Sequence, residues 1–141
     1  MILAKDIMSE DIEVIYEDML VREVAHLMMR DRVSGFPVVD RSGTAGMVGI
    51  ITMTDLFSVL GKTLDVQSGP PPLQSVSSLK NLCVRDVMTR KVISIPPSMT
   101  LDEIIHLVVH NGIHFFPVMD ESRMVGIVSR HDILNAVFSY D

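Results

Sequence analysis

Two short stretches of this chain combine hydroxyl and carboxylate side chains at the same spacing. In Gly49–Asp55, two apolar residues follow the glycine, a threonine comes three positions after it and an aspartate six positions after it. Gly126–Asp132 repeats this frame with a serine as the hydroxyl residue. An apolar run precedes each stretch and an apolar helical pattern follows, so each is predicted to join a strand to a helix. The free N–H groups and positive dipole end of such a helix favour a phosphate.

Composition and charge exclude several classes of protein. The 141 residues are 48% hydrophobic, which is enough for one compact domain or two small subdomains that share a core. A net charge of −6 with scattered basic residues argues against a nucleic-acid partner. No apolar stretch reaches the length of a membrane span, and the first residues lack the layout of a signal peptide. The single cysteine, Cys83, excludes an internal disulfide framework. We therefore expect a cytoplasmic protein without a membrane or nucleic-acid partner.

The chain contains one unit twice. Residues 5–40 align with residues 85–120 without a gap, with 11 identities in 36 positions. Residues 47–57 align with residues 124–134, with 5 identities in 11 positions. Such self-similarity indicates two copies of one supersecondary unit. We therefore divide the chain into a first repeat of residues 1–60, a linker of residues 61–82 and a second repeat of residues 83–141.

Hydrophobic periodicity predicts the same elements in both repeats. The first repeat should contain a strand over 12–15, a helix whose buried face carries Val21, Val24, Ala25 and Met28, a hairpin of strands 36–39 and 47–52, and a helix that ends near Gly61. The second should contain a strand over 92–95, a helix that begins at the capping-box residue Thr100 and ends at Asn111-Gly112, a hairpin of strands 115–119 and 124–129, and a helix over 130–138.

The resulting order is β-α-β-β-α in each repeat, which is a mixed α+β fold. The proline-rich linker excludes regular structure over 68–72. We interpret the linker mainly as a mobile tether, with a short helix over 73–82 as the alternative that its three serines disfavour. A unit of roughly 50 residues buries too little surface to be stable alone. We therefore expect the two repeats to pack sheet to sheet with pseudo-two-fold symmetry, and the two Gly…Asp stretches to open onto a cleft between them.

The chain resembles a tandem pair of cystathionine-β-synthase (CBS) domains, the unit called a Bateman module. Three ordered motifs carry the resemblance, and each occurs once per repeat. They are Asp6-Ile7-Met8 with Asp86-Val87-Met88, Phe36-Pro37-Val38-Val39-Asp40 with Phe116-Pro117-Val118-Met119-Asp120, and the two Gly…Asp stretches. The resemblance covers nearly everything except the linker. It implies a non-catalytic regulatory module that binds an adenosyl ligand between the repeats and often forms a homodimer.

The resemblance also implies roles for particular residues. Asp55 and Asp132 would accept ribose hydroxyls, because a carboxylate can accept two vicinal hydroxyls. The hydroxyl side chains of the two stretches would lie near the phosphate, and adenine would lie among residues of the first and second strands. These residues are Thr52, Thr54 and Ser129 for the phosphate, and Val14, Phe36, Pro37, Ser94, Phe116 and Pro117 for the adenine. The ligand would be AMP, ADP or ATP, with S-adenosylmethionine as an alternative, and no cofactor is required.

The two halves of this predicted site differ. Thr54 supplies the hydroxyl that adenylate-binding members prefer before the aspartate, whereas His131 stands at that position in the second stretch. Arg130 and His114 could add positive charge near a phosphate on the second side. We therefore expect ribose to be recognised mainly through Asp55, and one ligand rather than two.

Several alternatives remain open at this stage. The hydroxyl residues of the two stretches could serve only as helix caps, and the aspartates as first-turn carboxylates. His106, His110 and His114 are spaced four apart, but no Cys, Asp or Glu completes a convincing metal-ligand set. No nucleophile elbow, glycine-rich phosphate loop or carboxylate pair supports catalysis. For the ligand-binding module the expected role is energy sensing. The competing function is a dimerisation scaffold with an empty or vestigial cleft. The effector protein is unknown in either case.

Overall fold

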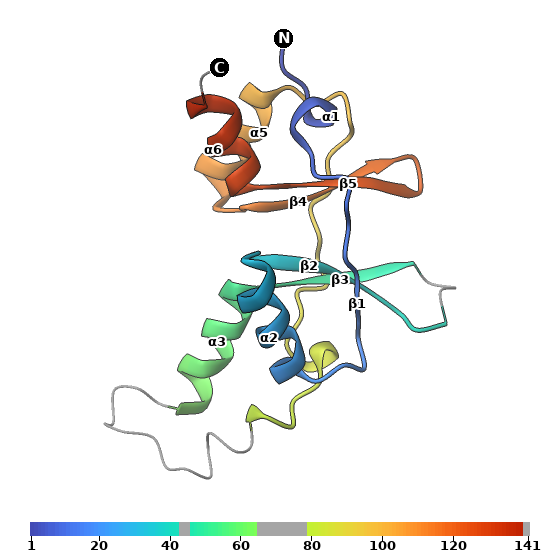
Figure 1. The fold of residues 1–141 in the computed structure, drawn as a ribbon, viewed down its shortest axis with the longest axis vertical. Helices are drawn as coiled ribbons and strands as arrows, with labels where there is room; N and C mark the ends of the chain where they lie inside the picture. The colour runs from blue at the N-terminus through green and yellow to red at the C-terminus, as the bar shows by residue number, and fades with distance from the viewer. Residues whose placement is uncertain (43–45, 65–78, 140–141) are drawn as a thin grey trace. The chain divides into compact units, whose positions relative to one another are not determined.

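The computed structural model describes residues 1–42, 46–64 and 79–139, which divide into two compact units (Figure 1). We call Glu13–Lys91 the central unit, and Met1–Ile12 with Val92–Asp141 the terminal unit. The units cut across the sequence repeats, because each contains the opening segment of the other repeat. Residues 1–12 of the first repeat belong to the terminal unit, and residues 83–91 of the second belong to the central unit.

The central unit is a three-stranded sheet with its helices on one face (Figure 1). The strand order is β1-β2-β3, with β1 parallel to β2 and β2 antiparallel to β3. Its elements are β1 (Ile15–Tyr16), α2 (Val21–Asp31), β2 (Gly35–Val39), β3 (Met47–Thr52), α3 (Met53–Leu64) and the 3₁₀ turn η2 (Val84–Asp86). The core consists of Ile15, Val24, Met28, Phe36, Val38, Ile51, Val84 and Met88.

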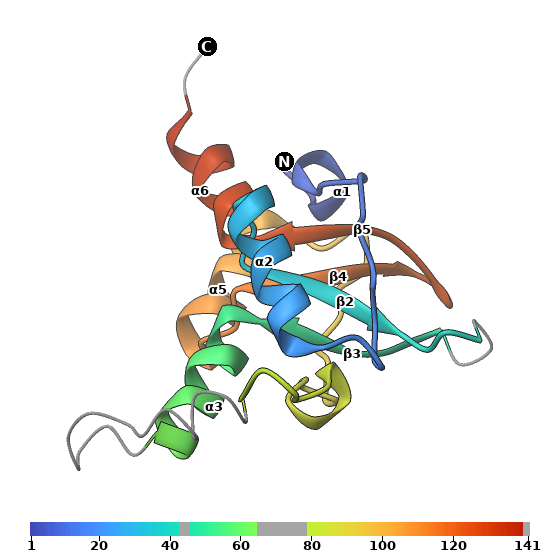
Figure 2. The ribbon, with the colours of Figure 1, turned by 60° about the horizontal axis from the view of Figure 1, so that its bottom comes forward.

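The terminal unit is built on the same plan around a two-stranded hairpin (Figure 2). Ile95 extends the hairpin by a parallel bridge to Val118, which takes the place of β1. The elements are α1 (Ala4–Ile7), α5 (Leu101–Asn111), β4 (Phe115–Asp120), β5 (Arg123–Ser129) and α6 (Arg130–Phe138). The core consists of Ala4, Ile95, Leu101, Ile104, Phe116, Val118, Val128 and Ile133. The predicted α+β class and the β-α-β-β-α order are confirmed.

Local sequence explains where the predicted helix α5 begins and ends. The Thr100 hydroxyl accepts the N–H of Glu103 at 3.2 Å, and the Glu103 carboxylate accepts the N–H of Thr100 at 3.2 Å. This reciprocal capping box satisfies two N–H groups that the helix leaves free. Gly112 ends the helix with φ of 68°, a left-handed conformation that glycine adopts without a Cβ penalty.

Both opening segments are compact turns fixed by an aspartate and an apolar side chain. The Asp6 carboxylate accepts the N–H of Leu3 at 2.8 Å, and the Asp86 carboxylate accepts the N–H of Cys83 at 3.2 Å. Two residues after each aspartate, Met8 packs against the terminal core and Met88 is buried in the central core. The repeated Asp-x-Met motif therefore closes a turn and anchors it to its unit.

Three predicted boundaries are wrong. The strand over 12–15 is reduced to Ile15–Tyr16, and of residues 92–95 only Ile95 pairs. Pro96 and Pro97 follow it and cannot donate to a ladder, so the pairing does not continue beyond Ile95. Gly61 does not end a helix, since α3 continues to Leu64 and Gly61 has no positive φ. The short helix over 73–82 lies mostly outside the described residues.

Candidate functional site

Asp55 and Asp132 occupy the same position in the first turn of α3 and α6. The Oδ2 atom of Asp55 accepts the N–H of Thr52 at 2.8 Å and the hydroxyl of Thr52 at 3.2 Å. The Oδ2 atom of Asp132 accepts the N–H of Ser129 at 2.9 Å and the hydroxyl of Ser129 at 3.0 Å. These are capping boxes, because the N–H of each aspartate points back to the same hydroxyl at 3.4 Å. The capping role weighed for Thr52 and Ser129 is confirmed.

A second hydroxyl reaches each aspartate from an opening segment. The Thr89 hydroxyl donates to Oδ1 of Asp55 at 2.7 Å, and the Ser9 hydroxyl donates to Oδ1 of Asp132 at 3.1 Å. Neither Ser9 nor Thr89 was predicted as a site residue from the sequence. The signal was present, since Ser9 and Thr89 follow Met8 and Met88 at equivalent positions of the aligned repeats.

The opening segments lie directly on the strands that lead to the aspartates. Thr89 and Ile50 exchange two backbone hydrogen bonds of 2.8 and 2.9 Å, and Ser9 and Ile127 do the same at 2.8 and 2.9 Å. This close approach explains the glycine of each motif. A Cβ added at Gly49 would lie 2.6 Å from the Thr89 carbonyl oxygen, closer than real Cβ contacts come.

At Gly126, the added Cβ would instead meet the Met8 side chain. The Met8 thioether is flexible, whereas the Thr89 carbonyl belongs to the backbone. Both motif glycines therefore make room for the opening segment, but Gly49 does so against the less adaptable neighbour.

The helix ends offer an anion fewer donors than the sequence predicts. The first N–H of α3, from Met53, bonds to the Ser34 carbonyl at 2.8 Å, and the first N–H of α6, from Arg130, bonds to the His114 carbonyl at 3.0 Å. The third N–H of each helix faces the capping hydroxyl. Among the described residues, the second N–H, from Thr54 or His131, has no partner and remains available.

The charges at the two helix ends differ as the sequence predicts. His114, Arg130 and His131 gather at the start of α6, and all three are exposed. The start of α3 has no basic residue, but the exposed Thr54 hydroxyl has no hydrogen-bond partner among the described residues. A phosphate is therefore favoured at α6, and a neutral hydrogen-bonding group at α3.

The predicted adenine residues separate onto two faces of the strands. Phe36 is 3% exposed and Phe116 is 0% exposed, and each belongs to the core of its unit. Successive side chains of a strand point to opposite faces. Pro37 and Pro117 therefore face away from the cores, and both are nevertheless buried.

Val14 immediately precedes β1 and is partly buried, and Ser94 immediately precedes the bridge residue Ile95 and is exposed. The structure thus puts the two phenylalanine side chains into the cores, whereas the other four predicted residues belong to neither core cluster. Contact between these four and adenine stays a prediction.

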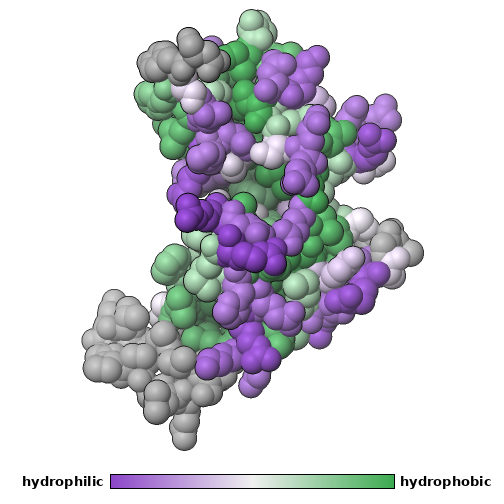
Figure 3. Space-filling model, viewed as in Figure 1, coloured by the Kyte–Doolittle hydropathy of each residue, from purple (hydrophilic) through white to green (hydrophobic). Residues whose placement is uncertain are grey.

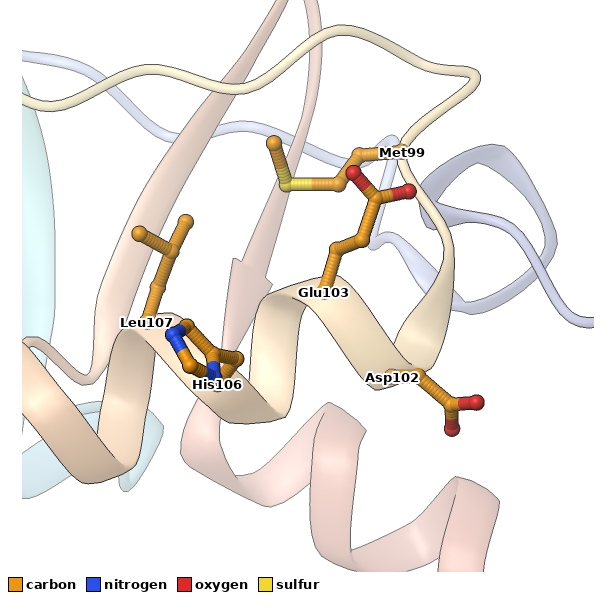
Figure 4. Close-up of a pocket in the computed structure, with 5 residues that line it drawn as sticks. All are labelled: Met99, Asp102, Glu103, His106 and Leu107. Atoms are coloured by element: carbon orange, nitrogen blue, oxygen red, sulfur yellow. The ribbon is translucent and has the colours of Figure 1, made fainter.

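A separate hollow of about 410 Å³ lies beside α5 (Figure 4). Four of its five lining residues are identical to the residue at the aligned position of the first repeat. Most of these four have a structural role within the terminal unit. Glu103 belongs to the capping box of α5, while Met99 and Leu107 pack against the terminal core. His106 stacks on His110 with ring centroids 4.0 Å apart. The complete lining is Met99, Asp102, Glu103, His106 and Leu107.

The described residues hold no group of three His, Cys, Asp or Glu side chains that could bind a metal ion. Among the helices of the same residues, none is long and apolar enough to cross a membrane.

Comparison with known proteins finds matches over most of the chain. The model of the CBS domain family matches residues 4–62 and 84–139. An uncharacterized protein of Methanocaldococcus jannaschii is 36% identical over 155 aligned residues, which cover 96% of this chain and 90% of that protein.

Two solved structures show the same fold. The CBS domain pair of protein MJ0100, in complex with 5′-methylthioadenosine and S-adenosyl-L-methionine, is 26% identical with a TM-score of 0.72, covering 96% of this chain and 98% of that chain. The structure of CBSX2 in complex with AMP is 23% identical with a TM-score of 0.73, covering 97% of this chain and 96% of that chain. At the latter identity the likeness shows the fold alone.

Proposed function

The chain belongs to the CBS domain family as a tandem pair, and we propose that it is a regulatory module that binds an adenosyl ligand. The observation that carries this proposal is the pair of oriented carboxylates, Asp55 and Asp132, at equivalent strand-to-helix junctions. A carboxylate has about four acceptor positions. At each aspartate, Oδ2 takes two hydrogen bonds and Oδ1 takes one, so one acceptor position of Oδ1 stays open to a ligand hydroxyl.

An adenosyl ligand suits this chemistry because its ribose supplies hydroxyl donors. The related MJ0100 pair is described in complex with two adenosyl compounds, which supports the same ligand class here. The basic residues at the start of α6, His114, Arg130 and His131, favour a phosphorylated member of that class, namely AMP, ADP or ATP. The sequence predicts one ligand between the repeats, held by ribose contacts at Asp55, and this stays a prediction.

We propose that a second copy of the chain, or an effector protein, receives the signal through the helices. Large apolar side chains are exposed at equivalent helical positions of the two repeats, Met29 with Val109 and Phe57 with Leu134. Figure 3 shows hydrophobic surface reaching the solvent among the hydrophilic residues of this view. A ligand that binds one conformation better would shift the population of conformations presented to the partner.

Thermal unfolding of the purified chain with AMP, ADP, ATP and S-adenosylmethionine, with GMP as control, tests the ligand class. A ligand at 100 times its Kd stabilises by about 2.7 kcal/mol, which gives a readily visible shift. We expect at least one adenosyl compound to raise the unfolding temperature and GMP to leave it unchanged. The absence of any shift at millimolar concentration would favour the scaffold function instead.

Substitution of the aspartates tests the site. Asp55→Ala should weaken nucleotide binding by roughly one to two orders of magnitude, since a hydrogen bond to a charged group is worth about that much. Asp102→Ala is the control, because Asp102 is an exposed first-turn aspartate of α5. A larger loss in Asp132→Ala with none in Asp55→Ala would reverse the predicted ranking of the two junctions.

A further inference from the structure

The hydroxyls of Thr89 and Ser9 contact the aspartates but are unlike the other hydroxyls of the site. Thr52 and Ser129 are neighbours of the aspartates in sequence and serve the helix ends as caps. Thr89 and Ser9 come from 34 and 123 residues away, and each belongs to the opening segment of the opposite repeat. Helix capping is already complete without them, so their role has to be sought at the carboxylate itself.

The geometry of Thr89 makes its hydroxyl a fixed donor. Its backbone is held to Ile50 of β3 by two hydrogen bonds, five residues before Asp55 in the same continuous strand and helix. Its hydroxyl bonds to Oδ1 at 2.7 Å, while Thr52 holds Oδ2. Both carboxylate oxygens are therefore held, and rotation of the carboxylate about its last torsion would break hydrogen bonds at both.

We propose, on the premise of the function above, that Thr89 and Ser9 are positioning residues that orient Asp55 and Asp132 for a ligand hydroxyl. Each half of the site would then depend on a side chain from the other repeat. The hydroxyl fixes Oδ1 so that its one remaining acceptor position has a defined direction. A preorganised acceptor binds more tightly because less conformational freedom is lost on binding.

The two repeats should differ in how strongly they depend on this hydroxyl. The bond from Thr89 is shorter than that from Ser9, 2.7 against 3.1 Å, and Ser9 is exposed whereas Thr89 is partly buried. A shorter and less solvated hydrogen bond to a charged acceptor is the stronger one. Removal of the Thr89 hydroxyl should therefore have the larger effect.

The ligand-free test is amide hydrogen exchange in the full chain. Thr89→Val keeps the side-chain shape and removes the hydroxyl, so the Thr52 N–H that bonds to Asp55 should exchange about two- to tenfold faster, the range of one ordinary hydrogen bond. Thr89→Ser should restore the wild-type rate. The Ser129 amide should not change in Thr89→Val, and Ser9→Ala should show the reverse pattern, so each variant is the control for the other.

The ligand test compares AMP with 2′,3′-dideoxy-AMP by calorimetry. Thr89→Val should raise the Kd of AMP by about two- to tenfold, and Thr89→Ser should rescue it. The Kd of the dideoxy compound should stay within about twofold, because it offers no ribose hydroxyl to the aspartate. A general structural defect would weaken both compounds equally and would contradict the proposal.

Two other results would contradict the positioning role of Thr89. Tighter AMP binding by Thr89→Val would show that the hydroxyl competes with the ligand, and would overturn the positioning role. Unchanged exchange at Thr52 would overturn it as well. If the wild-type chain binds no AMP, the proposed function fails at that point, whereas the exchange experiment still decides whether Thr89 holds the carboxylate.

Discussion

The glycine of the first Gly…Asp stretch should be intolerant of any side chain. In Gly49→Ala, the new Cβ would stand 2.6 Å from the Thr89 carbonyl oxygen and 3.2 Å from the Met88 sulfur. Ordinary carbon–oxygen contacts are about 3.3 Å or longer, so the segment must move by roughly 0.7 Å. That segment is held by two backbone hydrogen bonds between Thr89 and Ile50, and the shift would strain both.

The expected cost follows from these contacts. Overpacking costs about 1–3 kcal/mol, and weakening of the two hydrogen bonds adds up to about 1 kcal/mol. Alanine has a lower conformational entropy than glycine in the unfolded state, which offsets about 0.4–1 kcal/mol of this cost. At the middle of their ranges these contributions sum to about 2 kcal/mol, so we expect Gly49→Ala to lower the free energy of unfolding by about that amount, measured by urea denaturation.

Gly61→Ala is the matched control. Gly61 lies inside α3, and an added Cβ there would have no neighbour within 4 Å among the described residues. The same substitution should stabilise the chain by about 0.5–1 kcal/mol, because alanine is the better helix former. Equal changes in the free energy of unfolding for Gly49→Ala and Gly61→Ala would contradict the close contact between Thr89 and β3.

Three further predictions concern single contacts. Thr100→Ala should lower the free energy of unfolding by about 1 kcal/mol in urea titrations, through loss of the α5 cap, and an unchanged midpoint would contradict the capping role. Gly126→Ala should cost less than Gly49→Ala in the same assay, because the flexible Met8 side chain can move away. The hydrogen bonds from Arg41 lower the pKa of Asp18, so this pair stabilises the fold above the ordinary aspartate pKa and loses that contribution as the pH falls through the lowered value. The stability difference between wild type and Asp18→Asn should accordingly shrink in acid, and a difference independent of pH would refute the link.

Local pattern was sufficient for most of the secondary structure. The helix face of Val21, Val24 and Met28 and the capping box at Thr100 are written within single turns, so period and spacing reveal them. The hairpins also follow from short apolar runs and turn residues. The first strands were overestimated because β-branched composition does not say how many residues find a partner.

The exchange of the opening segments could not be read from the chain. Thr89 bonds to Asp55 across 34 residues and Ser9 bonds to Asp132 across 123, and neither contact leaves a local periodicity. The repeat alignment showed that Asp6-Ile7-Met8 and Asp86-Val87-Met88 are equivalent, but not which unit each one completes. Tertiary pairing decides this, and it also decides which strand face meets the core.

The environment of the two phenylalanines also depends on tertiary packing that the sequence does not reveal. The family resemblance implied an adenine contact for Phe36 and Phe116, yet both are core residues. The burial of a large apolar side chain is worth about 1.5–3 kcal/mol, which is sufficient reason for a phenylalanine at both positions. In contrast, the unequal charge of the two helix ends follows from residue type alone, and its role at a phosphate stays a prediction.

Titration of ¹⁵N-labelled protein with AMP, followed by amide chemical shifts, tests adenosyl binding most directly. We expect saturable shifts at Thr54 and Asp55, with further shifts at Arg130 and His131, and none of these with GMP. An absence of shifts at millimolar AMP would contradict the proposed function. Shifts confined to the hollow beside α5, around His106 and Leu107, would show binding at a different place and would contradict the site.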